Sequence, residues 1–330
     1  MKLRLILGGV GLAGAIAIVQ GGLIAQAPAP TQGRGQGAAP TQGRGAPAPA
    51  PPAQPQGRGQ GAAPPPPPPP AQQAALIDLT GNWVSVVDLD WRFRMMTPPK
   101  GDYAQVPMNA AARKVADTFD PALYGGANYQ TSQIIDCRAY GGAGLMHMPM
   151  RLRITWDSPE TLKIETDWGQ QTRLLHFTAG QPFGDIEVAF RNGDMGGSRG
   201  PASMQGYSVA AWQQPFRFNA TNYQRANVGR GGGLGQNRAG ELQTGGDLAV
   251  VTTDLTPGWL RRNGAPYSSR TRLIEHFMTF QDPTGKDWFT VTTEVIDPEY
   301  LNTPFYTSAE FQKEPDASKW APHPCKQVGQ

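Results

Sequence analysis

The chain has 330 residues, of which 41 are glycine and 32 are proline, and its formal net charge is +3. All of that excess lies before residue 76, because the rest of the chain carries 24 Lys and Arg residues against 26 Asp and Glu residues, a net charge of −2. A nucleic-acid-binding domain needs a basic surface, so we expect no nucleic-acid partner.

Residues 1–27 have the order of a secretory signal peptide. Lys2 and Arg4 precede an apolar run over 5–19, and the small residues Ala25 and Ala27 follow. The apolar run is shorter than the ~20 residues that a membrane helix needs. We therefore expect cleavage and a periplasmic or extracellular location, with an uncleaved anchor as the alternative. No long apolar run follows, so we expect no integral membrane domain after cleavage.

Residues 28–75 form a linker rich in Pro, Gly, Ala and Gln. The sequence Thr-Gln-Gly-Arg-Gly occurs at 31–35 and again at 41–45, and 64–70 is an unbroken run of proline. Few of these side chains can bury apolar area, so the composition predicts disorder, with the proline run as a stiff rod. We interpret the linker as a spacer that associates the domain with cell-envelope material. A recognition segment for an aromatic groove is the alternative.

Residues 76–330 are predicted to form a single, mainly β domain. A first strand is expected at 81–88, followed by one short helix at 108–119 that Asn109 caps and that ends at Asp120 and Pro121. Further strands are expected at 152–156, 161–166, 172–177, 206–212, 247–254, 271–280, 288–296 and 305–312. Turn residues rather than helices join them, which predicts an antiparallel up-and-down sheet, closed or nearly closed.

Two other features bear on the fold. Gly-rich stretches at 191–203 and 219–246 interrupt the strand pattern and are expected to be long surface loops, with disorder as the alternative. The chain has two cysteines, Cys137 and Cys325. An even cysteine count in an exported protein favours a disulfide between them, and two free buried thiols are the alternative.

Charged residues in the last strands are the candidate acid–base groups. Pairing through the turn at 282–285 would bring Glu275 or His276 near Glu294. A carboxylate inside a barrel is costly unless it is paired, and Arg173 or Arg92 could supply the opposite charge. Water-facing positions on an exposed strand are the alternative. The candidate catalytic residues are Glu275, His276, Glu294 and His176.

Two other patterns yield further candidates. Thioether and imidazole ligands suit Cu(I), so a copper site is one interpretation of Met146, His147, Met148 and Met150, and core filling is the other. Ser208 lies in Gly-Tyr-Ser-Val-Ala, which is close to a hydrolase nucleophile elbow, although the pattern continues as a strand. No other metal site and no cofactor are expected. The candidate ligand-binding residues are Trp83, Arg92, Trp156, Arg173, Trp212 and Trp288.

Gly81-Asn-Trp83 is similar to the Gly-x-Trp opening of lipocalins, in which the Trp plugs one end of the barrel. More broadly, the chain resembles a family of exported bacterial proteins of unknown function with a lipocalin-like β domain. The segments that carry this resemblance are 78–84, 95–106, 137–141, 162–167, 204–212, 251–260, 264–268, 297–301 and 319–320. The resemblance implies an envelope location and transfers no catalytic residue.

Three hypotheses about function follow. The first is a barrel that binds a small apolar or amphipathic ligand. The second is an enzyme that uses a carboxylate or histidine in the barrel cavity for acid–base chemistry. The third is a structural envelope protein. Convergence of the polar candidates in a cavity would favour the enzyme, and an apolar cavity with one polar end would favour the binder. A filled interior would favour the structural role.

Overall fold

The computed structural model describes residues 66–178, 190–191, 199–213 and 246–329. The predicted signal peptide and linker up to residue 65 lie outside the described residues, as do 192–198 and 219–245 of the two Gly-rich stretches.

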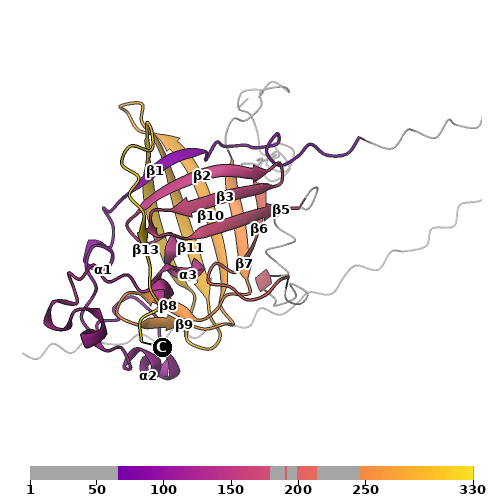
Figure 1. The fold of residues 1–330 in the computed structure, drawn as a ribbon. Coiled ribbons are helices and arrows are strands. Elements are labelled where there is room, and N and C mark those ends of the chain that lie inside the picture. Colours follow the sequence, from indigo (N-terminus) through magenta and orange to yellow (C-terminus); the bar gives the residue numbers. More distant parts are fainter. Residues whose placement is uncertain (1–65, 179–189, 192–198, 214–245, 330) are drawn as a thin grey trace, which may run out of the picture. The chain divides into compact units, whose positions relative to one another are not determined.

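Nine strands close into a barrel (Figure 1). Around the barrel they follow the order β1, β12, β11, β10, β7, β6, β5, β3 and β2, and β2 pairs with β1 to close it. Every barrel strand was predicted from sequence, and the predicted closure is confirmed. The bounds are Gly81–Val86 (β1), Arg151–Ser158 (β2), Thr161–Thr166 (β3), Thr172–Phe177 (β5), Tyr207–Gln213 (β6), Asp247–Thr253 (β7), Arg272–Gln281 (β10), Asp287–Ile296 (β11) and Phe305–Glu314 (β12).

The prediction of a purely antiparallel, up-and-down sheet is wrong at one pair. Strands β5 and β6 are parallel, with Leu175 opposite Ser208 and Phe177 opposite Ala210. Parallel neighbours need a crossover connection of a dozen or more residues, and 178–206 is long enough to provide one. The other barrel pairs are antiparallel, so the sheet is mixed.

Short elements gather at one end of the barrel, the lower end in Figure 1. The predicted helix is α2 (Ala110–Ala116), shorter than expected, and Asn109 Oδ1 accepts a hydrogen bond from Ala112 N at 3.0 Å, as a cap should. The bounds of the remaining helices are Trp91–Arg94 (α1), Gly142–Leu145 (α3), and the 3-10 turns Pro121–Tyr124, Gly126–Asn128 and Cys137–Tyr140. Two small sheets pair β8 (Gly258–Arg261) with β9 (Ala265–Tyr267), and β4 (Trp168–Gly169) with β13 (His323–Pro324).

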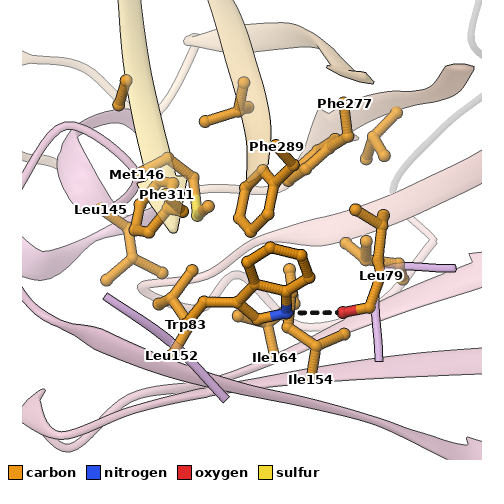
Figure 2. Packing of buried hydrophobic residues seen from close by; sticks show 14 of the residues in the cluster. Leu79, Trp83, Leu145, Met146, Leu152, Ile154, Ile164, Phe277, Phe289 and Phe311 are labelled. Atoms are coloured by element: carbon orange, nitrogen blue, oxygen red, sulfur yellow. Dashed lines mark hydrogen bonds between the residues drawn. The ribbon is translucent and has the colours of Figure 1, made fainter. Parts of the chain in front are cut away.

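Apolar side chains fill much of the barrel interior. Because strand residues alternate between faces, Leu152 and Ile154 of β2 point inward with Ile164 of β3. Trp83 of β1 lies among them, with its ring centroid 4.8 Å from that of Phe289, and its Nε1 donates to Leu79 O at 2.8 Å (Figure 2). Trp83 thus packs inside the barrel near the start of β1.

The predicted disulfide joins Cys137 to Cys325, which are 188 residues apart in sequence. Backbone hydrogen bonds hold the C-terminal segment on either side of it. Lys326 N donates to Ile135 O at 2.9 Å, and His323 N donates to Asp167 O at 2.8 Å. The segment therefore ties the short elements at the lower end to β4. Among the described residues, no helix is both long and apolar enough to cross a membrane.

Candidate functional site

Glu275 lies inside the barrel and is paired with Arg173, one of the two partners proposed from sequence. Both side chains are 0% exposed. Arg173 Nη1 donates to Glu275 Oε1 at 3.0 Å, and its Nη2 contacts Oε2. Arg173 also donates to Ser208 Oγ at 3.2 Å and to Thr252 Oγ1 at 2.8 Å. Arg173 and Glu275 therefore neutralise each other in a closed hydrogen-bond network.

Glu294 and His276 lie on the outer face of the barrel instead. In the β10–β11 register, Ile274 is opposite Glu294, so His276 shares the outer face with Glu294. Arg191 Nη2 donates to Glu294 Oε2 at 2.8 Å, and this contact is the main cause that lowers the pKa of Glu294. His276 Nδ1 lies 2.9 Å from Asp247 Oδ2. The sequence-based expectation that His276 approaches Glu294 agrees with this arrangement, whereas Glu275 points to the other side.

His176 lies apart from these groups, and Ser208 belongs to the Arg173 network inside the barrel. The His176 ring stacks on Tyr207 with centroids 4.8 Å apart, and partial burial lowers its pKa. Ser208 lies within β6, which runs on to Gln213, so the strand-turn-helix geometry of a nucleophile elbow is absent at this position. The four acid–base candidates thus do not converge on one site, because Glu275 lies inside the barrel while Glu294 and His276 share its outer face.

The methionine-rich segment belongs to the core. Met146, Met148 and Met150 are buried members of the main apolar cluster, the role that flexible methionines commonly have. Burial, with the nearby charges of Arg94 and Arg261, lowers the pKa of His147 to about 3. No group of three or more His, Cys, Asp or Glu side chains in the described part of the chain is arranged to hold a metal ion.

The tryptophan candidates, by contrast, come together at the upper end of the barrel. Trp156 lies near the end of β2 and Trp212 near the end of β6, with ring centroids 6.5 Å apart. Phe177, the last residue of β5, bridges them at 5.5 Å from Trp156 and 5.2 Å from Trp212. These three rings form an aromatic cluster at the mouth of the barrel.

Residues 70–80, which we call the strap, cross this end just before β1 (Figure 1). Trp212 Nε1 donates to Ala71 O at 2.8 Å, and Ala71 N donates to Glu160 Oε2 at 3.1 Å. Further along, the Leu79 side chain is buried in the core beside Trp83. The strap is thus fastened to the barrel at both of its ends.

Two open hollows lie along the strap. The first, which we call the rim hollow, has a volume of about 470 Å³, and its lining residues are Gln72, Ala75, Leu76, Ile77, Asp78, Leu79, Thr80, Trp156, Leu162 and Trp212. The second has a volume of about 330 Å³ and is lined by Asp78, Trp83, Thr279, Phe280, Gln281, Asp287, Trp288 and Lys313. All four tryptophans proposed from sequence therefore line hollows at one end.

Arg92, the remaining candidate, is not part of this end. It belongs to α1, its side chain is 62% exposed, and it pairs with Asp102. Arg173 lies in the barrel wall network described above. The sequence analysis missed the contribution of the strap, because residues 70–75 share the composition of the linker. The Trp212 contact with Ala71 could not be foreseen from that composition.

Comparison with known proteins identifies no relative. No protein-family description, no curated protein and no solved structure matches this chain.

Proposed function

We propose that the protein binds a small apolar or amphipathic ligand in the rim hollow. The observation that carries the proposal is the pairing of an apolar wall with a polar edge in one hollow. Trp156, Leu162 and Trp212 line its barrel side, and Gln72, Asp78 and Thr80 line its edge. A volume of about 470 Å³ falls in the range of small-molecule sites, roughly 300–1,000 Å³.

An acid–base enzyme has less support. Perturbed titratable groups converge in a typical active site, whereas Glu275, Glu294 and His176 lie apart, and Glu275 is neutralised by Arg173. A purely structural role does not account for the rim hollow. The ligand would sit at the rim rather than deep in the barrel, since the side chains around Trp83 fill the interior.

We also propose that the protein works outside the cytoplasm, as the sequence order of its first 27 residues predicts. The disulfide between Cys137 and Cys325 supports this location, because disulfides persist mainly in oxidising compartments.

Native mass spectrometry of the protein purified from its own host tests the binding proposal. We expect an added small-molecule mass in the wild type, and displacement of that molecule by a dansylated fatty acid. Trp156→Ala removes one wall of the hollow and should weaken probe binding about tenfold. Trp320→Ala, at a tryptophan outside the hollow, is the matched control. A wild type with no bound molecule and no saturable probe binding would refute the proposal.

A further inference from the structure

A third hollow lies on the flank of the barrel, away from the strap. It has a volume of about 390 Å³ and opens between the end of β1, α1, the start of β2 and β4. We call it the flank hollow. It falls in the size range of small-molecule sites, roughly 300–1,000 Å³. Its lining residues are Val84, Ser85, Val87, Trp91, Met95, Pro149, Met150, Arg151, Asp167 and Trp168.

Two indole rings with unused N–H groups face this hollow. The indole N–H groups of Trp83, Trp212, Trp259 and Trp288 all donate to protein acceptors. For Trp91 and Trp168, no acceptor is found within the part of the chain that the structure describes. Trp91 is also 56% exposed, although a tryptophan ring gains by burial. The Trp91 ring is thus available to a ligand, whereas the Trp168 ring stacks on His323 with centroids 4.6 Å apart and offers its N–H group.

Arg151 adds a third donor. Its Nε donates to Glu314 Oε2 at 3.0 Å, while its Nη1 stays 4.0 Å from Asp167 Oδ2, beyond hydrogen-bond distance. The guanidinium is partly exposed, so its terminal N–H groups remain free for a ligand. The accessible polar groups of the flank hollow are therefore hydrogen-bond donors set beside aromatic faces.

Asp167 holds two of these residues in place. Its Oδ1 accepts hydrogen bonds from Arg151 N at 2.8 Å and Trp168 N at 2.7 Å. Its Oδ2 has no hydrogen-bond partner and is buried. Burial raises the pKa of this carboxyl. Asp167 is thus a positioning residue beneath the hollow rather than a ligand-contacting group.

The charges around the hollow cancel. Arg151 and Lys319 both lie within 4 Å of Glu314, and Asp167 supplies the second negative charge. A hollow with no net charge gives no advantage to an ionic ligand. Aromatic faces attract the C–H groups of a ring, because the face carries the negative end of the quadrupole. Free N–H groups attract the hydroxyl and ring oxygens of the same ligand. Sugar rings combine these two properties.

We propose that the flank hollow binds an uncharged oligosaccharide, with Trp91 as the stacking platform and Trp168 and Arg151 as hydrogen-bond donors. This inference is independent of the ligand proposed for the rim hollow, because the two hollows share no lining residue.

Isothermal titration calorimetry of the full chain with cellohexaose, maltohexaose and chitohexaose tests the inference. We expect saturable binding of at least one of these glycans, weakened about tenfold by Trp91→Ala. Trp320→Ala is the matched control, because Trp320 lies outside the hollow and stacks with Arg153, 4.5 Å from its ring centroid. It should leave the affinity unchanged, as should Trp156→Ala in the rim hollow.

Two results would overturn the inference: no binding of any of the three glycans at millimolar concentration, or binding that Trp91→Ala leaves intact. Arg151→Lys provides a second check, because it keeps the charge and removes the planar donor. We expect it to weaken glycan binding while the thermal unfolding midpoint stays close to that of the wild type.

Discussion

The guanidinium of Arg173 and the carboxylate of Glu275 are both fully buried inside the barrel. Ser208 and Thr252 complete the network, and their hydroxyl oxygens lie 2.9 Å apart. An ion pair of this kind contributes little net stability relative to apolar side chains, but removing one partner leaves a buried uncompensated charge. Replacing one partner should therefore destabilise the protein more than replacing both partners with apolar residues.

We expect Glu275→Leu to lower the free energy of unfolding by about 3–5 kcal/mol, because Arg173 would be left unpaired. The double variant Arg173→Met/Glu275→Leu should recover most of that loss. Urea denaturation of the wild type, both single variants and the double variant measures the coupling. A loss in the double variant equal to the sum of the two single-variant losses would show that the pair is not coupled.

His147 should make the protein less stable in mild acid. Burial, with Arg94 and Arg261, lowers the pKa of His147 to about 3, even though Asp90 Oδ2 lies 3.7 Å from its Nε2. The unfolded chain, with a histidine pKa of about 6.5, then binds more protons than the folded chain between those two values. Stability is complete above about pH 6.5 and falls as the pH drops toward about 3.

The contribution of His147 to this loss at pH 5 should be about 2 kcal/mol, at 1.36 kcal/mol for each pKa unit. We expect His147→Gln to flatten the dependence of the unfolding free energy on pH between about 4 and 6.5. Urea denaturation at a series of pH values measures it, with His323→Gln at the exposed C-terminal segment as the control. An unchanged slope in His147→Gln would contradict the assignment.

At the scale of elements, two indole N–H groups hold the strap, that of Trp212 at Ala71 and that of Trp83 at Leu79. Trp212 Nε1 holds Ala71 O at 2.8 Å, and the Trp212 ring packs against Phe177. Trp212→Phe should keep the aromatic contact and remove the hydrogen bond, at a cost of about 1 kcal/mol. We expect faster amide hydrogen exchange confined to residues 71–79. Exchange that increases throughout the barrel instead would mean that the strap is not a separate unit of stability.

Sequence patterns located the barrel strands but not all of their partners. Alternation identified β3, β10 and β11 because one face is buried, yet it contains no information about strand direction, so the parallel β5–β6 pair was missed. Strand β8 escaped because all four of its residues are buried and no alternation results. Strands β4 and β13 have two residues each, too few for any period.

The sequence identified some of the residues of the candidate site but not how they are arranged. Composition identified Trp83, Trp156, Trp212 and Trp288 as ring-bearing candidates, and the register brings all four to one end. The cost of a buried charge suggested Arg173 or Arg92 as a partner for a carboxylate, and the structure pairs Arg173 with Glu275. Trp91 was not among the ligand-binding candidates because α1 lies between strands in a segment without periodicity. Arg151 was missed because it precedes the strand predicted at 152–156.

At the scale of the whole molecule, the disulfide closes a loop of 188 residues. In the chain-entropy model, a loop of this length reduces the freedom of the unfolded state by about 5 kcal/mol. We expect the double variant Cys137→Ser/Cys325→Ser to lose about 2–5 kcal/mol of unfolding free energy. Guanidinium denaturation measures the loss, with the reduced wild type as the control. Equal stability of the variant and the oxidised wild type would contradict this expectation.

The barrel is closed by its first and last strands. Asn82 of β1 pairs with Glu314 of β12, more than two hundred residues later, and the other edge of β1 pairs with β2. During synthesis from the N-terminus, β1 is the first barrel strand to be made. Its partner β12 is made only after nearly all of the domain. Such distant pairing slows folding, and an unpaired strand edge can recruit other chains. Incomplete synthesis is therefore a risk for aggregation in this architecture. A chain whose synthesis stops before residue 305 lacks β12, so one edge of β1 stays unpaired.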